Sequence, residues 1–381
     1  MNKKRLQLMQ RHATRAIFFI SGFGAASWAP LVPVLKAKLA IAEDTLGLLI
    51  LCIGIGSLIA MPLAGNAASK FGCKKVLTTA SIIFPILLLL ICIFSTLETI
   101  VPTLLIFGAV MGCMDVVMNI QAVMVEKMYG RQIMSGMHAL WSVGGFTGAG
   151  LFGIWVGLFN LTPFISTLIA AAIMLAILSY FAKFLLPYGG KSSSSIIAIP
   201  HGIVIFIGII TCIAYLVEGA IMDWSGVFLT TAKNFDISLA GIGFTMFSAA
   251  MLTMRLIGDR LVQAIGQKIV VIFGSVLSFI GFILLIFSDV QTLLYLGFFL
   301  IGIGSANIVP VFFSIIGRQK VMPVNMAVPA VSTIAYVGIL VGPAAIGFLA
   351  HQTSLYVAFG FLATLVAAQL FIANYIFRQN V

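Results

Sequence analysis

The sequence predicts an all-α, polytopic membrane protein with twelve transmembrane helices in two related six-helix halves. The chain of 381 residues is 61% hydrophobic and only 8% charged, whereas soluble domains are nearer one quarter charged. Its apolar residues form twelve runs of about 20 residues, the length that a helix needs to cross a bilayer. These runs are too long and too continuous for a transmembrane β-barrel, whose strands alternate in character over about ten residues.

Short loops join the twelve predicted spans. In the first half the spans are residues 14–37, 45–68, 76–95, 101–125, 134–157 and 162–186. In the second half they are residues 202–229, 238–262, 268–288, 291–316, 325–350 and 354–377. The longest loop, residues 188–201, is rich in Gly, Ser and Pro, a composition typical of linkers. We therefore expect two domains, residues 1–187 and 202–381.

The first span follows a basic segment, MNKKRLQLMQRHATR, and this pattern is shared with secretory signal peptides. The count of the later spans requires the first one, so we expect it to be retained. It contains Trp28 but no acid and no amide.

The basic residues predict the orientation in the membrane. Assigning the loops alternately to two sides places 18 of the 21 Lys and Arg residues on the side that holds both termini. The other side holds Lys36, Lys38 and Lys233. Because positive residues are enriched in cytoplasmic loops, we expect both termini in the cytoplasm. The charges are spread over short loops rather than one solvated face, which argues against a nucleic-acid partner despite the net charge of +11.

Asp115 is the main candidate site. It lies about 21 Å into the span 101–125 at ~1.5 Å per residue, inside a hydrocarbon layer about 30 Å thick. A charged carboxylate there is costly unless it faces water, a partner or a cavity. Gly108, Gly112, Asp115 and Asn119 share one helical face, which predicts the wall of a polar path. The alternative is a neutral Asp115 that is hydrogen-bonded between packed helices.

The seventh span, residues 202–229, contains two acids, Glu218 and Asp223. Five residues correspond to about 140° around a helix, so a regular helix cannot direct both acids at one cavity. Either Gly219 lets the helix unwind locally, as transporter helices do at their sites, or one acid faces elsewhere. We expect the deeper Glu218 to face the cavity and Asp223, beside Trp224, to lie at the membrane interface, where aromatic residues gather.

Glycines recur at a fixed offset between the halves. Three in the fifth span and three in the eleventh are 194 residues apart: Gly144, Gly148 and Gly153, and Gly338, Gly342 and Gly347. Gly65 and Gly258, at the ends of the second and eighth spans, are 193 residues apart. Related six-helix halves with a linker are a known layout of secondary transporters. The alternative is that transmembrane helices are simply rich in glycine.

The loop after the second span, GNAASKFGCKK at residues 65–75, resembles the glycine, acid and basic signature of the major facilitator superfamily. Ser69 stands at the acid position here. Arg255 and Asp259, at the end of the eighth span, are four residues apart and can pair. The resemblance implies that both loops gate the cytoplasmic side, although the lysines of the first loop can equally serve as cytoplasmic anchors. The predicted gating residues are Gly65, Gly72, Arg255, Asp259 and Pro310.

A narrower resemblance is to the fucose–proton symporter family. It rests on short motifs: Asp115-Val-Val-Met-Asn119, Trp141-Ser142-Val-Gly144, and Asn307 followed by Pro310-Val-Phe-Phe-Ser314. The resemblance implies that Asp115 is the proton site, that the tenth span breaks at Pro310 and that the protein lies in the inner membrane of a bacterium. The first span lacks the acid and amides of the sugar transporters, which argues against a sugar substrate.

These features predict a monomeric secondary transporter that moves a small polar solute by alternating access, coupled to protons through Asp115 and Glu218. The expected solute contacts, on the first, fourth, fifth, seventh and tenth spans, are Trp28, Asn119, Trp141, Ser142, Tyr215, Asp223 and Asn307. The alternative for Asn119 and Asn307 is a hydrogen bond to a neighbouring helix, and for Trp28 and Trp141 it is packing against neighbouring helices. One alternative is efflux by proton exchange, although the fifth span lacks the proline of the efflux signature. A non-transporting solute sensor is another. The sequence contains no phosphate-binding glycine loop and no cluster with metal-ligand spacing, so we expect neither enzyme activity nor a cofactor.

Overall fold

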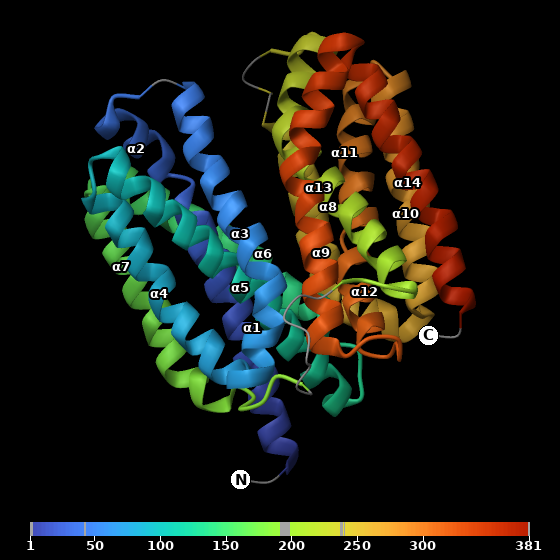
Figure 1. Ribbon diagram of the computed structural model, residues 1–381. Coiled ribbons are helices and arrows are strands. Elements are labelled where there is room, and N and C mark those ends of the chain that lie inside the picture. The colour runs from blue at the N-terminus through green and yellow to red at the C-terminus, as the bar shows by residue number, and fades with distance from the viewer. Residues whose placement is uncertain (1–2, 42, 191–198, 237–238, 240, 380–381) are drawn as a thin grey trace. The chain divides into compact units, whose positions relative to one another are not determined.

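The computed structural model describes residues 3–41, 43–190, 199–236, 239 and 241–379, and every regular element among them is helical. The chain divides into two compact units (Figure 1). Unit 1 comprises Met1–Gly130, Met137–Ile199 and Pro323–Ala330, and unit 2 comprises Arg131–Gly136, Pro200–Met322 and Val331–Val381. Residues 191–198, most of the predicted linker, lie outside the described residues, as does the predicted start of the eighth span at residue 238.

The first six spans correspond to seven helices. These are α1 (Lys3–Trp28), α2 (Leu31–Leu39), α3 (Glu43–Phe71), α4 (Cys73–Ile93), α5 (Leu97–Tyr129), α6 (Met134–Gly157) and α7 (Pro163–Phe181), with a 3₁₀ turn, η1 (Ala182–Phe184), at the end. Local signals set several boundaries. Thr162 accepts a hydrogen bond from the Ile165 N–H at 3.2 Å, and Pro163 follows it, so α7 begins there. Gly130, with φ of 71°, ends α5 in the left-handed conformation that glycine favours.

The last six spans also correspond to seven helices. These are α8 (Ile203–Val227), α9 (Ile242–Ile265), α10 (Gln267–Phe287), α11 (Gln291–Ser305), α12 (Ile308–Ile316), α13 (Val324–Gln352) and α14 (Leu355–Arg378). A π turn, η2 (Phe228–Ala232), follows α8. Ser354 accepts a hydrogen bond from the Val357 N–H at 3.3 Å and caps α14.

In the described part of the chain, eleven helical segments are long and apolar enough to cross a membrane. They match eleven of the twelve predicted spans. The remaining one is α9, which carries Arg255, Asp259 and Arg260. The first span is not one helix, because α1 ends at Trp28 and α2 begins at Leu31. Pro30 and Pro33 have no N–H, so neither can donate the hydrogen bond that would continue α1.

The glycine repeat corresponds to a repeated helix contact. In unit 1 a β-carbon on Gly144 would overlap the carbonyl oxygen of Phe19, so α6 packs closely on α1. In unit 2 a β-carbon on Gly338 would overlap the carbonyl oxygen of Cys212, so α13 packs in the same way on α8. One turn later the contacts recur between Gly148 and Phe23 and between Gly342 and Leu216. The third pair differs, because Gly153 adjoins open space and Gly347 adjoins Trp224.

Gly108 and Gly112 of α5 pack against α3. A β-carbon on Gly108 would overlap the carbonyl oxygen of Ile53, and one on Gly112 would lie 2.8 Å from the Cα of Ser57. The Ser57 hydroxyl also donates a 2.8 Å hydrogen bond to the Gly108 carbonyl. The prediction that these two glycines line a polar path is therefore wrong. Their lack of a side chain serves close helix packing instead.

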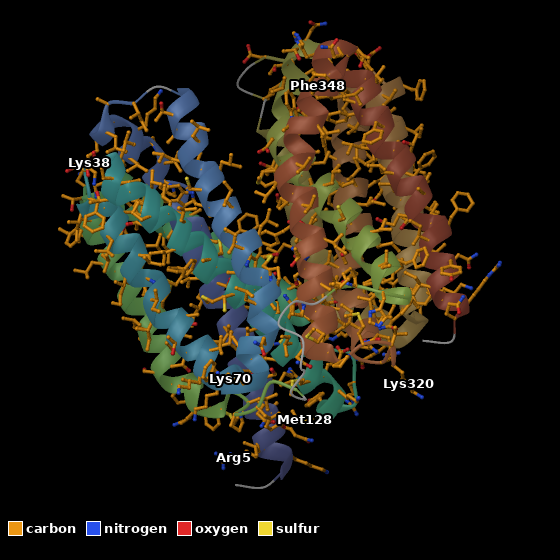
Figure 2. All side chains as sticks on the ribbon, viewed as in Figure 1. Arg5, Lys38, Lys70, Met128, Lys320 and Phe348 are labelled. Carbon is orange, nitrogen blue, oxygen red and sulfur yellow. The ribbon has the colours of Figure 1, made fainter. Side chains whose placement is uncertain are left out.

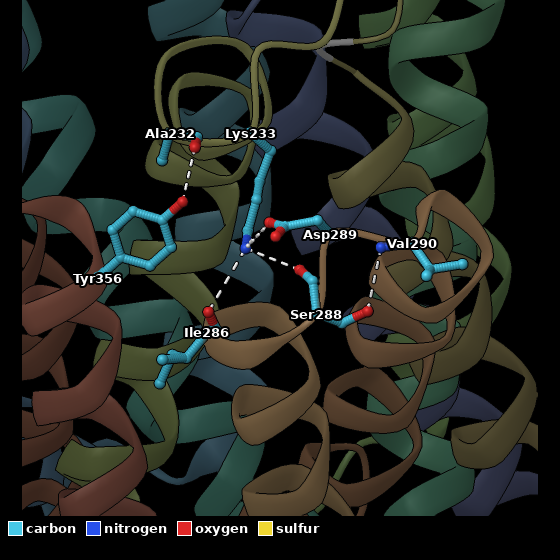
Figure 3. Close-up of polar contacts among 7 residues, drawn as sticks. All are labelled: Ala232, Lys233, Ile286, Ser288, Asp289, Val290 and Tyr356. Carbon is cyan, nitrogen blue, oxygen red and sulfur yellow. Dashed lines mark hydrogen bonds and ion pairs between the residues drawn. The ribbon is translucent and has the colours of Figure 1, made fainter.

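Lys233 of unit 2 caps α10 from the loop after η2 (Figure 3). Its Nζ donates hydrogen bonds to the carbonyls of Ile286 (3.4 Å) and Ser288 (2.7 Å) and lies 2.9 Å from Asp289 Oδ1. It also lies over the Tyr356 ring, 4.9 Å from the centroid. Because the last carbonyls of a helix lack intrahelical donors, a cation placed there satisfies them and complements the helix dipole.

Lys38 of unit 1 does the same for α4. Its Nζ donates to the carbonyls of Ile91 (3.2 Å) and Cys92 (2.8 Å), and it lies at an exposed edge of the unit (Figure 2). Lys38 and Lys233 are 195 residues apart, so the caps belong to the repeat. Sequence reasoning counted both lysines only as loop charges.

Candidate functional site

Asp115 lies in the middle of α5. The residue is partly exposed, but its Oδ2 atom is buried and has no hydrogen-bond partner among the described residues. One turn later Asn119 is fully buried, and its Nδ2 donates a 2.8 Å hydrogen bond to the Asp115 carbonyl. Asn119 Oδ1 is also buried without a partner in the described part of the chain. Helix α5 therefore presents two unsatisfied acceptors one turn apart, an arrangement that favours a site where a proton or a solute supplies a donor.

The other predicted contacts of unit 1 lie on α1 and α6. Trp28 ends α1, and its ring centroid lies 6.1 Å from that of Phe107 on α5. The Trp141 backbone abuts Gly22, which holds this part of α6 against α1. Ser142 donates a 3.4 Å hydrogen bond to the His138 carbonyl. Because α1 packs against both α5 and α6, these residues belong to the helix cluster that contains Asp115.

Glu218 of α8 is paired with Arg255 of α9. Arg255 Nη2 lies 3.4 Å from Glu218 Oε2, and the two side chains are 5% and 26% exposed. An arginine keeps its proton in proteins, so Glu218 supplies the counter-charge that lowers the cost of burying this guanidinium. Helix α8 is continuous through Gly219; the local unwinding considered from the sequence is absent.

Arg255 also stabilises the division of the tenth span. Helix α11 ends at Ser305 and α12 begins at Ile308, so the break predicted near Pro310 is present. Because Pro310 has no N–H, the Ala306 carbonyl four residues earlier lacks its helical donor. Arg255 Nε donates to this carbonyl at 3.2 Å. Arg255 thus contacts both Glu218 of α8 and the break between α11 and α12.

Asn307 forms the N-terminal boundary of α12. Its Nδ2 donates a 3.3 Å hydrogen bond to the Met254 carbonyl of α9. Its Oδ1 is buried and has no partner among the residues that the structure describes. A β-carbon on Gly258 would overlap this Oδ1, so Gly258 admits Asn307 between the helices. The carbonyl that Pro310 leaves without a donor is bound by Arg255 and not by Asn307.

Asp223 and Tyr215 are not part of this ion pair. Asp223 is exposed, and its neighbour Trp224 packs against Gly347 of α13. On a regular helix it points about 140° away from Glu218. Tyr215 is partly exposed, and its ring centroid lies 6.2 Å from that of Tyr336 on α13.

The predicted gating residues occupy close-packed positions. A β-carbon on Gly65 would overlap the Asn325 carbonyl. Gly72 joins α3 to α4 with φ of 83°, a conformation that side chains rarely adopt. Asp259 Oδ1 accepts a 3.1 Å hydrogen bond from the Gly136 N–H. The close contact at Gly65 and the positive φ at Gly72 explain why both residues are glycines.

The structure links Glu218, which the sequence predicted for proton coupling, to Arg255 and to the break before Pro310, which it predicted for gating. The sequence contains one sign that Arg255 needs a charged partner. Arg255 lies two turns inside the predicted span 238–262, a depth at which a charge needs a partner. The described residues contain no group of three or more His, Cys, Asp or Glu side chains that could hold a metal ion.

Comparison with known sequences places these features in context. The model of the Major Facilitator Superfamily matches residues 16–205 and 207–380. An uncharacterized MFS-type transporter of Yersinia pestis is 45% identical over 361 residues, which cover 94% of each chain. The uncharacterized transporter y4wD of Sinorhizobium fredii is 31% identical over 358 residues, 92% of this chain and 94% of that protein.

Solved structures share the fold. The human organic anion transporter MFSD10 superimposes with a TM-score of 0.79 at 14% identity, over 96% of this chain and 99% of that one. The Escherichia coli fucose:proton symporter FucP gives a TM-score of 0.80 at 13% identity, over 97% and 99%. At these identities the likeness concerns the fold alone, and it confirms the predicted fold class.

Proposed function

The chain belongs to the major facilitator superfamily, whose members are secondary transporters, and we propose that it carries a small polar solute together with protons by alternating access. One observation carries the proposal. Asp115 is an acid in the middle of a membrane-spanning helix, and its Oδ2 is buried with no hydrogen-bond partner among the described residues. Taking up a proton removes charge from a place that lacks a hydrogen-bond donor, so loading and unloading of this group can be tied to solute movement.

Glu218 is proposed as the second titrating group. Its protonation removes the charge that faces Arg255, which also holds the Ala306 carbonyl. The break between α11 and α12 is therefore linked, through Arg255, to the protonation of Glu218. We propose that Arg255 and Pro310, with Gly65, Gly72 and Asp259, control opening at the predicted cytoplasmic side.

We assign solute contacts to Trp28, Asn119, Trp141 and Ser142 in unit 1 and to Tyr215, Asp223 and Asn307 in unit 2. Asn119 and Asn307 each carry a buried Oδ1 atom without a partner in the described part of the chain. Each can accept a hydrogen bond from a hydroxyl or an amine. These acceptors favour a solute that carries such donors.

The proposed location is the inner membrane of a bacterium, with a monomeric chain and both termini in the cytoplasm. The 18 basic residues on one side support this orientation. Reporter fusions after Lys191 and after Arg378 should both report cytoplasm, and a fusion after Lys233 should report the opposite side. The same compartment for Lys191 and Lys233 would contradict the twelve-span arrangement.

The test begins with a thermal-shift screen of the purified protein against nucleosides, amino acids, organic acids and sugars, because a bound ligand raises apparent stability. The solute found is then offered to proteoliposomes with and without an inward proton gradient. Symport predicts accumulation only with the gradient. Accumulation without any gradient would contradict proton coupling, and expulsion of solute from loaded vesicles by the same gradient would replace symport with efflux by proton exchange.

A further inference from the structure

Unit 2 contains a pocket that is lined in part by Lys320, which Figure 2 labels. It has a volume of about 470 Å³ and lies among three segments: residues 202–206 at the start of α8, residues 318–321 after α12, and residues 375–379 at the end of α14. Its charged side chains are Arg318 and Lys320, both exposed. We call it the basic pocket.

None of the described side chains that line the basic pocket is acidic. The sequence contains no Asp or Glu between residues 127 and 217 or between residues 290 and 381, and all three segments come from these ranges. Among the described residues, no carboxylate forms an ion pair with Arg318 or Lys320. Two cations without an ion-pair partner among the described residues attract an anion.

The loop that carries the two cations is held in place by Gln319. This side chain is buried, and its Oε1 accepts hydrogen bonds from the Val321 and Met322 N–H groups, each at 2.8 Å. Its Nε2 donates to the Ile316 carbonyl at 3.2 Å. Arg318 and Lys320 therefore project from a fixed turn, which lowers the entropic cost of binding a ligand between them.

The rest of the pocket is apolar and continues along the unit. The rings of Phe206 and Tyr375 lie 4.9 Å apart, and they join α8 to α14 at the pocket floor. One turn from them, Ile209 and Phe371 are exposed on the same helix faces. In a membrane-spanning helix pair, exposed apolar side chains of this kind face lipid tails.

We infer that the basic pocket binds the phosphate headgroup of an anionic phospholipid, with an acyl chain along α8 and α14. The headgroup lies between Arg318 and Lys320, and Tyr375 offers a hydroxyl at the membrane interface. The pocket lies at the end predicted to face the cytoplasm, where anionic lipids attract basic side chains at about 1 kcal/mol per residue. A soluble anion would use the two cations but not the apolar floor.

The test measures lipid binding to the full-length purified protein by native mass spectrometry, with phosphatidylglycerol and phosphatidylcholine of identical acyl chains. Arg318→Gln/Lys320→Gln should weaken phosphatidylglycerol binding about thirty-fold, the equivalent of about 2 kcal/mol for two basic residues, and leave phosphatidylcholine binding unchanged. Arg318→Lys/Lys320→Arg keeps both charges and should keep the binding.

The matched control is Arg260→Gln/Lys268→Gln, which removes two exposed cations on the same predicted side but outside the pocket. It should bind phosphatidylglycerol as the unmodified protein does. Excess glycerol phosphate should not displace the lipid. Equal binding of the two lipids, unchanged binding by the Arg318/Lys320 variant, an equal loss in the control, or full displacement by glycerol phosphate would each overturn the inference.

Discussion

The two units share their packing and differ in their buried charges. Unit 1 has an acid on α5, Asp115, for which no ion pair is found among the described residues, and unit 2 has the pair of Glu218 and Arg255. The close glycine contacts and the lysine caps occur in both units at offsets of 193 to 195 residues. Contacts that repeat form the scaffold, because each half needs them to pack. Polar groups that do not repeat are not required for this shared packing, so they are the better candidates for function.

The counterpart positions make this contrast concrete. Arg255 corresponds to Met61 and Glu218 to Ala25, whereas Asp115 corresponds to Val309. Met61 and Val309 are buried apolar residues. Each half thus has a charged residue where the other half has an apolar one. The charged residues are therefore not part of the internal repeat.

The largest effect on stability is expected for Arg255→Met, which places in unit 2 the residue found at the matching position of unit 1. It leaves Glu218 without its counter-charge and the Ala306 carbonyl without its donor. Breaking a buried pair in this way costs about 3 kcal/mol, moderated here because Glu218 is 26% exposed. Thermal unfolding in detergent measures the loss, and the double variant Arg255→Met/Glu218→Gln should recover part of it. Equal stability of Arg255→Met and the unmodified protein would show that the pair is incidental.

Glycine replacements should act alike in both units. Gly108→Ala and Gly302→Ala each place a β-carbon against a backbone carbonyl, of Ile53 and Phe247 respectively. We expect each to cost about 1–3 kcal/mol by overpacking, seen as a lower unfolding temperature. Gly153→Ala is the control, because no atom lies within 4 Å of its added β-carbon. A loss in only one unit would contradict the shared scaffold.

The lysine caps should show a smaller and unequal effect. Lys233→Met removes two carbonyl contacts and an ion pair from a side chain that is 2% exposed, and we expect a cost of about 1–2 kcal/mol. Lys38→Met removes two carbonyl contacts from an exposed residue, and we expect about 0.5–1 kcal/mol. The unfolding temperatures of the two variants, measured side by side, check the order. A larger loss of stability for Lys38→Met than for Lys233→Met would contradict the expectation that the more buried lysine stabilises its helix more.

The smallest effect on stability is expected for Pro310→Ala. The new N–H competes with Arg255 for the Ala306 carbonyl and favours a continuous helix, as α5 is in unit 1. The amount of folded protein should stay the same while solute uptake slows several-fold. Unchanged uptake at equal expression would mean that the break has no part in transport.

The spans could be predicted from the sequence because apolar run length is a local property. The span 134–157 matches α6, Met134–Gly157, at both ends. Long-range contacts could not be predicted in the same way. Arg255 and Glu218 are 37 residues apart, and their pairing depends on how α8 and α9 pack. A glycine face fits a polar path and a close helix contact equally well, so the sequence alone does not assign Gly108 and Gly112 to packing.

The lysine caps were within reach of the sequence. Lys38 and Lys233 follow the same offset as the glycines, and each lies beyond the end of a predicted span. The shared offset marks them as part of the repeat, although each position also fits a loop charge. The break after Trp28 was also within reach, since Pro30 and Pro33 interrupt the predicted first span.

The central claim is that Asp115 carries the proton, and solute-driven proton movement tests it most directly. Proteoliposomes loaded with a pH-sensitive dye and given the solute without any imposed gradient should acidify inside. Asp115→Asn should still bind solute and exchange labelled for unlabelled solute, because shape and hydrogen-bonding capacity are kept, yet produce no acidification. Glu98→Gln, which changes an exposed acid in the first turn of the same helix, is the control and should acidify normally. Acidification by Asp115→Asn at the unmodified rate would contradict the account and transfer the proton site to Glu218.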